Sequence, residues 1–377
     1  CSSLAVWDDK SDDGGLLIGR NFDFYANDDF AKNKIISFIK PNTGYPYMSV
    51  TWAGMIGVSS GMNIEGLTVT INAGKSSIPL KAKTPISLVA LEILQYATTI
   101  DEAIEIARNK KVFVSESMMI GSAKDHRAVL IEISPNNFGV YEMENQPYLV
   151  CTNHFQSDVY KGDKRNNKQK EESHSVYRFE KIEEHLSNEN KLNPTKMVEI
   201  LRDTNGLKNT KLGYGNEKAL NQLLAHHSIV FQPDKRLVWV SSSPYQLGEF
   251  TAYDLNKIFN DSISDYTLNN DSLKIEKDDF LNSKEYGNYE EFRKQNQQIV
   301  NFLKNDEHIE KSFLEEFIQN NPDFWMVYDK VGDYYFQQKD YQQASFYFKL
   351  ALTKEITTIP DRNKIQKKLA KCSRKTR

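Results

Sequence analysis

The chain has 377 residues, 39% of them hydrophobic and 11% aromatic, and a formal net charge of −3. This composition is sufficient for a packed core, and the small net charge gives no reason to expect nucleic acid or an anionic membrane as a partner. No segment reaches the ~18 apolar residues that a membrane-spanning helix needs, and three cysteines are too few for a disulfide framework. No cysteine and histidine spacing suggests zinc, and the adjacent His226 and His227 are expected to point to opposite faces of a strand, so we expect no metal and no cofactor.

The first 80 residues predict β structure. An apolar segment at residues 4–7 is followed by the turn sequence Asp-Asp-Gly-Gly and by a second apolar segment at residues 16–24. Turns of this composition join antiparallel neighbours, so this hairpin is expected to bring Arg20 and Asp23 close to the N-terminus. Further strands are predicted at residues 35–39, 47–52, 56–58 and 67–71, separated by glycine-rich turns such as residues 61–66.

A helical spacing of apolar residues replaces the strands at residues 85–109. Thr99 followed by Glu102 fits the capping box that opens a helix, so two helices are expected here. Strands return between residues 117 and 155, and the polar segment 161–173 predicts a mobile surface loop. Beyond it the pattern predicts helices at residues 176–186, 195–202 and 220–224, a β-hairpin at residues 228–241 and a closing strand at residues 250–254.

From about residue 260 the composition shifts to Asn, Asp, Lys, Glu and Gln, and helical spacing dominates. We therefore expect two domains, an N-terminal domain over residues 1–259 and a helical C-terminal extension over residues 260–377. Aromatic and small residues between 326 and 352 have the spacing of one tetratricopeptide-like helix pair. A single pair needs a neighbour to be stable, so the extension is expected to pack on the main domain or on a partner, with a purely structural role as the simpler alternative.

Cys1 is the leading candidate nucleophile. The printed chain begins with it, so a thiol and an α-amine would belong to one residue. A thiolate is a strong nucleophile, and an α-amine with a pKa of about 7.7–8.0 can act as a base near neutral pH, so the two together suit acyl transfer. Three simpler explanations of Cys1 are a remnant of preparation, the lipid-modified first residue of a bacterial lipoprotein, and a buried small residue.

Other nucleophiles are weaker candidates than Cys1. No glycine-rich phosphate loop and no Gly-x-Ser-x-Gly elbow is present. Cys151 lies in an apolar strand, where a thiol is typically buried and inert. Cys372 lies in the basic tail without an evident base. The chemistry is therefore expected at the N-terminus.

Six short segments carry a family resemblance. They are Cys1-Ser2-Ser3, Gly-Arg-Asn-Phe-Asp at 19–23, Gly-Met-Asn-Ile-Glu-Gly-Leu at 61–67, Ile-Asn-Ala-Gly at 71–74, Cys-Thr-Asn-His-Phe at 151–155, and His-Ser-Ile-Val-Phe at 227–231 leading to Pro244. In their order and placement they resemble the N-terminal-nucleophile hydrolases of the penicillin acyltransferase-like cysteine family, akin to isopenicillin-N acyltransferase and more distantly to choloylglycine hydrolase and acid ceramidase. The resemblance covers about residues 1–255. It implies an α+β fold in four αββα layers and a precursor that cleaves itself just before Cys1.

The resemblance also implies roles for five residues. Cys1 would attack an amide carbonyl while its own α-amine moves the proton, Asp23 would hold that amine, and Arg20 would lie beside the thiol and favour the thiolate. Asn153 would donate its side-chain N–H to the tetrahedral oxyanion, a contact typically worth roughly 2.7–4 kcal/mol, and Asn72 would add a second contact through its backbone. The alternatives are a surface ion pair for Arg20 and Asp23, and turn positions for the two asparagines.

One position departs from the family pattern. Choloylglycine hydrolases carry an arginine on a late strand, and the corresponding segment here, residues 237–241, has the sequence Leu-Val-Trp-Val-Ser. Arg236 precedes it by one place and is more simply a turn residue. His154 follows the proposed oxyanion residue, and because adjacent strand residues face apart, a structural role is expected for it. This departure weakens a bile salt assignment and leaves the late-strand partner of the site unnamed.

These observations predict an N-terminal cysteine amidohydrolase or acyltransferase that acts on linear, non-peptide amides through a thioester on Cys1. A bile salt or N-acyl-lipid amidase of the same fold is one alternative, and a lipoprotein-anchored, tetratricopeptide-like scaffold without catalysis is another. Early aromatic residues could line an apolar acyl pocket, although core packing explains them equally well. They are Phe22, Phe24, Tyr25, Phe30 and Trp52.

The expected partner is a small-molecule acyl amide. A homo-oligomer or a protein contact through the helical extension stays open. Relatives of this type often carry a leader, so the resemblance favours an exported bacterial protein of the periplasm or cell surface, and the compartment is otherwise open.

Overall fold

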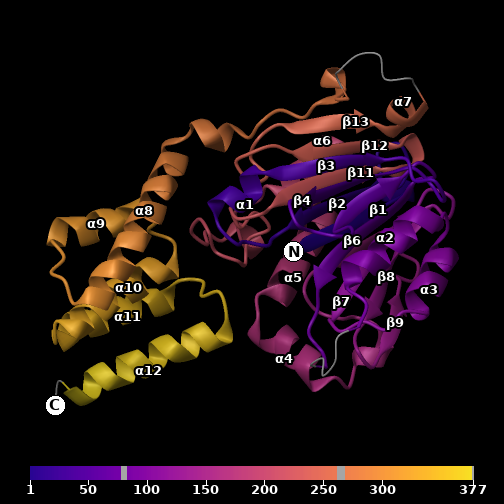
Figure 1. The fold of residues 1–377 in the computed structure, drawn as a ribbon. Helices are drawn as coiled ribbons and strands as arrows, with labels where there is room; N and C mark the ends of the chain where they lie inside the picture. The colour runs from indigo at the N-terminus through magenta and orange to yellow at the C-terminus, as the bar shows by residue number, and fades with distance from the viewer. Residues whose placement is uncertain (78–82, 261–267, 376–377) are drawn as a thin grey trace. The chain divides into compact units, whose positions relative to one another are not determined.

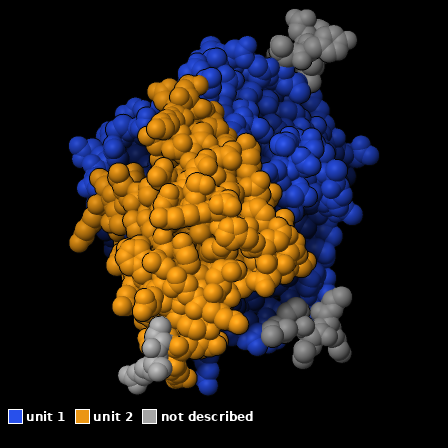
Figure 2. All heavy atoms as spheres, turned by 90° about the vertical axis from the view of Figure 1, so that its left-hand side faces the viewer, with its two compact units in different colours: residues 1–171, 175–203, 224–277 blue, residues 172–174, 204–223, 278–377 orange. Residues whose placement is uncertain are grey.

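The computed structural model of the chain describes residues 1–77, 83–260 and 268–375, and Figure 1 labels its helices and strands. Contacts divide the chain into two units, coloured separately in Figure 2. Unit 1 comprises residues 1–171, 175–203 and 224–277, and unit 2 comprises residues 172–174, 204–223 and 278–377. The units interleave in the sequence, and the predicted division into domains at residue 259 stays a prediction.

A six-stranded antiparallel sheet carries the N-terminus, and its strand order is β10-β1-β2-β11-β12-β13. The predicted hairpin of the first two strands is confirmed, with Ser3 opposite Arg20. On the other side of β1, Ser3 lies opposite Cys151. The start of β1 therefore lies between the ends of β2 and β10. The strands are β1 Ser2–Val6, β2 Leu17–Phe22, β10 Tyr148–Cys151, β11 His227–Gln232, β12 Leu237–Ser241 and β13 Phe250–Asp254.

A seven-stranded antiparallel sheet follows the chain order from β3 to β9. The predicted strand at residues 56–58 is wrong, because Gly57 has a φ of +102° and a side chain at this position would collide with the backbone of Ser87. The strand begins at Ser60 instead, and the turn that follows is held by the Asn63 side chain, which accepts from the backbone N–H of Glu65 at 3.1 Å. The strands are β3 Lys34–Ile39, β4 Tyr47–Trp52, β5 Ser60–Asn63, β6 Leu67–Ala73, β7 Glu116–Ser122, β8 Arg127–Ile133 and β9 Phe138–Tyr141.

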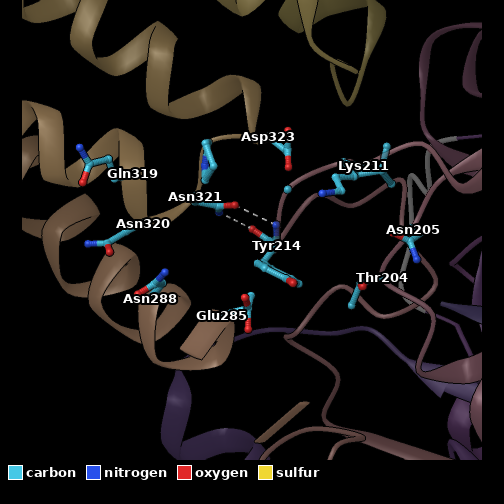
Figure 3. Close-up of a pocket in the computed structure, with 13 residues that line it drawn as sticks. Thr204, Asn205, Lys211, Tyr214, Glu285, Asn288, Gln319, Asn320, Asn321 and Asp323 are labelled. Atoms are coloured by element: carbon cyan, nitrogen blue, oxygen red, sulfur yellow. Dashed lines mark hydrogen bonds between the residues drawn. The ribbon is translucent and has the colours of Figure 1, made fainter. Parts of the chain in front are cut away.

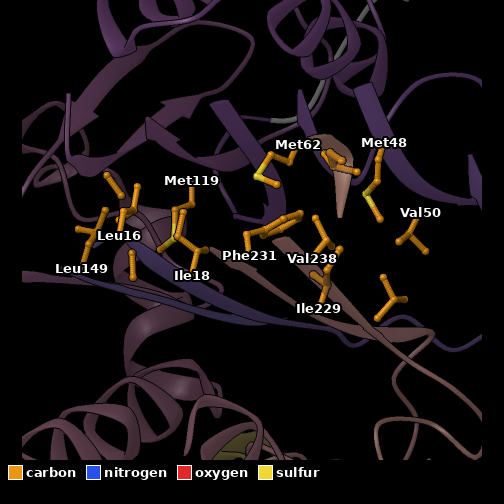
Figure 4. Close-up of a cluster of buried hydrophobic side chains, with 14 of the residues drawn as sticks. Leu16, Ile18, Met48, Val50, Met62, Met119, Leu149, Ile229, Phe231 and Val238 are labelled. Atoms are coloured by element: carbon orange, nitrogen blue, oxygen red, sulfur yellow. The ribbon is translucent and has the colours of Figure 1, made fainter. Parts of the chain in front are cut away.

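The two sheets pack face to face, and helices cover their outer faces. Apolar side chains of both sheets form the core between them, as Figure 4 shows for Ile18 and Ile229 opposite Met62 and Met119. On the seven-stranded sheet lie α2, Ile86–Tyr96, and α3, Ile100–Arg108, and on the six-stranded sheet lie α5, Ser175–Asn188, and α6, Pro194–Leu201. This is the predicted α+β fold in αββα layers, and the predicted Thr99 and Glu102 capping box is present.

Two local predictions are wrong. Most of the polar segment 161–173 is not a loop but helix α4, Lys164–Glu172. The Asp163 side chain caps its first turn by accepting from Asn166 N at 3.0 Å, and the Asn166 amide is anchored on both backbone groups of Phe155. The predicted helix at residues 220–224 is instead a turn, because Leu223 has a φ of +53° and donates its N–H to the Asn221 side chain.

Unit 2 is helical in its C-terminal part, as predicted. Its helices include α10, Trp325–Gln337, and α11, Tyr341–Thr353, which pack closely because Gly332 leaves room for the buried ring of Phe348. The tetratricopeptide assignment of this pair stays a prediction.

No helix within the described ranges is long and apolar enough to cross a membrane. The remaining α-helices of the described residues are α1 Asp28–Lys32 and α7 Leu255–Asn260 in unit 1, and α8 Lys284–Asn305, α9 Lys311–Asn320 and α12 Ile359–Lys375 in unit 2.

The Phe348 ring is expected to determine the stability of the helix pair. Phe348→Ala removes a fully buried ring and should lower the free energy of unfolding of this region by about 3–5 kcal/mol. Native-state hydrogen exchange of peptides from α10 and α11 measures the loss. Phe346→Ala is the matched control, because that ring is on the same helix and 53% exposed. Equal losses in both variants would contradict this packing role.

Candidate active site

Cys1 directly precedes β1, and its side chain is only 7% exposed. Its α-amine lies 3.3 Å from Asp23 Oδ2 and 3.2 Å from Asn153 Oδ1. The sheet register explains this convergence, since Asp23 follows β2 and Asn153 follows β10, the two neighbours of β1. The predicted hairpin therefore does bring Asp23 to the N-terminus.

Arg20 lies on the sulfur side of Cys1. Its Nη2 is 3.8 Å from Cys1 Sγ, and its other contacts are the carbonyls of Ser59 and Ile71 and the hydroxyl of Ser60. Arg20 is fully buried and the Asp23 side chain is 2% exposed. The alternative of a surface ion pair is therefore wrong.

Burial changes the protonation of the Cys1 α-amine. Its pKa falls from the usual 8.0 to about 5, mainly because burial disfavours the charged form. The Asp23 carboxylate opposes this shift, whereas the cations Arg178 and Arg20 add to it. At neutral pH the amine is therefore uncharged, and its lone pair is available to accept a proton.

The two asparagines of the site differ in what their side chains can do. The Asn153 amide donates to Ala73 O at 2.9 Å, which leaves its second N–H for another acceptor. The Asn72 side chain is buried between the sheets, accepts from Ser3 Oγ at 3.0 Å and donates to Cys151 O at 3.1 Å. Asn72 thus joins the two sheets, and a substrate contact through its backbone stays a prediction.

Arg178, which the sequence reasoning missed, completes the site. It is fully buried, and its Nη1 donates to Cys1 O at 2.5 Å and to Ser2 Oγ at 2.7 Å, while its Nη2 donates to Asn153 Oδ1 at 2.7 Å. The late strand supplies no arginine, and Arg236 is a turn residue with a φ of +60°, as predicted. The signal for Arg178 was its position on the face of α5 that also holds Ile182, where a charge is unexpected.

The histidines near the site are neutral, and their ring nitrogens bond to protein side chains. Burial lowers the pKa of His154 to about 4, and its Nδ1 lies 2.8 Å from Ser175 Oγ, so it supports the Asn153 loop as expected. His226 and His227 do not point apart, because His226 precedes β11, and their Nδ1 atoms are 2.8 Å apart. No cluster of three or more His, Cys, Asp or Glu side chains suited to a metal was found among residues 1–77, 83–260 and 268–375.

A cluster of aromatic side chains lies next to Arg20, the residue that contacts the Cys1 sulfur. The Arg20 guanidinium lies 4.4 Å from the ring centre of Phe22, which stacks on Trp52 at 5.8 Å. Phe30 contacts Trp52 at 5.1 Å and Phe24 at 5.7 Å, and the Phe24 ring is 53% exposed. An aromatic cluster thus extends from the nucleophile to solvent.

A separate polar cavity of about 290 Å³ lies within unit 2 (Figure 3). Amide groups such as Asn288 and Gln319 dominate its lining, and Asn321 is bonded to the backbone of Tyr214. Its lining contains neither cysteine nor histidine, so it offers no counterpart to the thiol and amine of Cys1.

The αββα layers, with a cysteine at the start of a central strand, are the architecture that the sequence predicted for an N-terminal-nucleophile hydrolase. A family model described as acyl-coenzyme A:6-aminopenicillanic acid acyl-transferase matches residues 7–244, more than half of the chain. The chain belongs to this family and is an enzyme.

Individual relatives are distant. An uncharacterized protein of Archaeoglobus fulgidus is 25% identical over 152 residues, which is 38% of this chain and 25% of that relative, so the match spans a quarter of the relative's length. Among solved structures, a Caenorhabditis elegans ortholog of N-acylethanolamine-hydrolyzing acid amidase is 22% identical with a TM-score of 0.45, covering 62% of this chain and 93% of that one. A variant of conjugated bile acid hydrolase from Clostridium perfringens is 15% identical with a TM-score of 0.47, covering 68% and 93%.

The charges around Cys1 predict opposite effects of two substitutions on its amine. Asp23→Asn removes the group that raises the α-amine pKa and should move it below about 5, whereas Arg178→Met removes a cation and should move it above about 5. The ¹⁵N chemical shift of the α-amine in protein labelled at cysteine, followed against pH, measures both. A wild-type midpoint near the ordinary 8.0 would contradict the burial argument.

Proposed function

We propose that the chain is an amide hydrolase or acyltransferase that forms a thioester on Cys1. The observation that carries this proposal is the geometry of Cys1, whose α-amine lies 3.3 Å from Asp23 and 3.2 Å from Asn153 and whose sulfur lies 3.8 Å from Arg20. Burial lowers the pKa of this amine to about 5, which leaves it unprotonated at neutral pH on the same residue as the thiol. A base so close to a nucleophile needs no further residue to remove the thiol proton. Membership of an acyltransferase family supports the same reaction class.

In the first half of the reaction, the α-amine takes the thiol proton and the sulfur attacks the carbonyl carbon of a linear amide. The carbonyl electron pair moves to oxygen, and the second N–H of Asn153 stabilises that charge, with the backbone of Asn72 as a further donor. When the tetrahedral intermediate collapses, the C–N bond breaks and the leaving nitrogen takes the proton from the α-ammonium group. The product is a thioester on Cys1 and a free amine.

In the second half, a water or an acceptor amine attacks the thioester and gives its proton to the α-amine. The C–S bond breaks, and the sulfur leaves as a thiolate beside Arg20, which stabilises its charge. Water as acceptor makes the enzyme a hydrolase, and an amine makes it an acyltransferase. Asp23 and Asn153 hold the α-amine in place through both halves.

The acyl group is expected to be apolar. The aromatic cluster of Phe22, Phe24, Phe30 and Trp52 starts at Arg20 and ends in a solvent-exposed ring. Such a surface favours an apolar group next to the scissile carbonyl because contact removes apolar area from water.

Trapping of the acyl-enzyme tests the reaction. Incubation with short-chain, aromatic and long-chain acyl amides and a bile acid conjugate should add an acyl mass to Cys1, visible in the intact mass and in the N-terminal peptide. Cys1→Ala should show no adduct and no turnover. Cys151→Ala is the matched control and should keep the adduct, because that thiol is buried and burial raises its pKa to about 12. An adduct that persists in Cys1→Ala would rule out this nucleophile.

Maturation is proposed to occur by self-cleavage before Cys1, because the α-amine can serve as base only after the bond that precedes it is cut. A precursor with additional residues before Cys1 should be processed on its own, whereas the Cys1→Ala precursor should keep its full mass. N-terminal mass also identifies a lipid-modified Cys1, the anchor alternative. Normal processing of the Cys1→Ala precursor would exclude autocatalysis.

A further inference from the structure

A hydrogen-bonded chain of four buried side chains leads to the Cys1 thiol. His226 Nδ1 and His227 Nδ1 are 2.8 Å apart, and His227 Nε2 lies 2.8 Å from Ser60 Oγ. The Ser60 hydroxyl also accepts from Arg20 Nη1, and Arg20 Nη2 is 3.8 Å from the sulfur. All four side chains are fully buried. We call His226, His227, Ser60 and Arg20 the thiol chain.

The thiol chain crosses from one sheet to the other. His227 on β11 and Arg20 on β2 belong to the six-stranded sheet, whereas Ser60 on β5 belongs to the seven-stranded sheet. The Ser60 hydroxyl thus links both His227 and Arg20 of the six-stranded sheet to the seven-stranded sheet. A change at Ser60 would act on the direction of the Arg20 guanidinium.

The protons of the thiol chain can be assigned. Burial and the charges of Arg20 and Lys34 lower the pKa of both histidines, to about 4 for His226 and well below the ordinary value for His227, so each carries a single N–H at neutral pH. Two Nδ1 atoms in contact require one donor and one acceptor. Because Ser60 Oγ already accepts from Arg20, the assignment that gives the Ser60 hydroxyl proton an acceptor has Ser60 O–H donating to His227 Nε2 and His227 Nδ1–H donating to His226.

The surroundings of His226 agree with this assignment. Its remaining N–H is then on Nε2, an atom without a hydrogen-bond partner in the described part of the chain. The ring lies among aromatic neighbours, 4.5 Å from Phe30 and 5.2 Å from Trp52. An N–H directed at aromatic rings is weakly favourable, whereas a bare nitrogen lone pair there would gain nothing. The opposite assignment would also leave the Ser60 hydroxyl proton without a described acceptor.

The assignment has a consequence for Arg20. Its terminal nitrogens carry four N–H groups, and their four acceptors are Ser59 O, Ser60 Oγ, Ile71 O and the Cys1 sulfur. With three of these acceptors fixed in the seven-stranded sheet, the fourth N–H is directed at the sulfur. Loss of the Ser60 acceptor would leave one Nη1–H without its partner and only the Ser59 and Ile71 carbonyls to set the orientation of the guanidinium.

We propose that Ser60 and His227 are positioning residues that hold Arg20 in the orientation that stabilises the Cys1 thiolate. This inference deepens the proposed function, on which it rests for the role of Cys1 as nucleophile. His227 keeps the Ser60 hydroxyl turned so that its oxygen faces Arg20, and Ser60 transmits this constraint to the guanidinium. Neither residue touches the substrate.

The test is the pH dependence of Cys1 alkylation by iodoacetamide, read by mass on the N-terminal peptide, which needs no substrate. Ser60→Ala should raise the midpoint for the thiol by about one pH unit and slow alkylation below that midpoint roughly tenfold. The other charged or titratable groups acting on Arg20 and on the amine stay in place, namely Asp23, Glu116, Cys151 and Arg178. Ser122→Ala is the matched control, because Ser122 is also fully buried in the same sheet and its hydroxyl bonds to Thr98 O.

His227 tests the same link from the other side and covers the case in which Ser60→Ala fails to fold. His227→Phe removes the acceptor for the Ser60 hydroxyl and should raise the midpoint, whereas His227→Gln supplies a side-chain oxygen and should restore it. A ¹⁵N spectrum of the histidine rings should find the protons on His227 Nδ1 and His226 Nε2.

The outcomes are distinguishable. Wild-type midpoints in both Ser60→Ala and His227→Phe would overturn the positioning role, even if Cys1 still traps acyl groups. A shifted midpoint in a protein that traps no acyl group would support the positioning role and count against the proposed function. A proton on His226 Nδ1 would overturn the assigned direction of the thiol chain.

Discussion

A single guanidinium buried between two sheets holds the site together. Arg20 extends from β2 of one sheet and donates to the carbonyls of Ser59 and Ile71 and to the hydroxyl of Ser60 in the other, with one terminal N–H left for the Cys1 sulfur. Burying a cation is costly unless its hydrogen bonds are satisfied, and burial lowers the pKa of Arg20 to about 9, which still leaves it charged at neutral pH. The packing distance and register of the sheets must therefore supply acceptors at fixed places, and the thiol is one of them.

The site depends on segments that are far apart in sequence but adjacent in the sheets. Cys1 directly precedes β1, and Asp23 and Asn153 follow the two strands that pair with β1, so a slip of one residue in either pairing would turn the corresponding side chain to the opposite face. Arg178 adds a constraint from outside the sheets, because it holds the Cys1 carbonyl and the Asn153 amide oxygen together. The amide of Asn153 is thereby oriented from both ends, with its oxygen toward the α-amine and Arg178 and its nitrogen toward Ala73 O.

Much of this arrangement could be predicted from local patterns. The turn after β1 and the apolar strand that follows specify a hairpin, and a hairpin brings Arg20 and Asp23 to the N-terminus without knowledge of the rest. Arg178 could not be found in this way, because its partners lie about 25 and 177 residues away and helical spacing only marks it as a buried charge. The polar helix α4 was missed for a related reason: it is anchored by the buried side chain of Asn166 rather than by an apolar face.

The cations near Cys1 act on both of its reactive groups. Burial, aided by Arg178 and Arg20, lowers the pKa of the α-amine, so the amine is a free base above about pH 5 and loses that role as the pH falls through this value. A cation beside a thiol favours its ionised form, so Arg20 also stabilises the thiolate, whereas burial itself opposes the ionised form. Glu116 counteracts these cations only in part, because burial raises its pKa to about 7. Asp23 raises the pKa of the amine and that of Arg20, and its carboxylate holds the amine in place without reversing its protonation state.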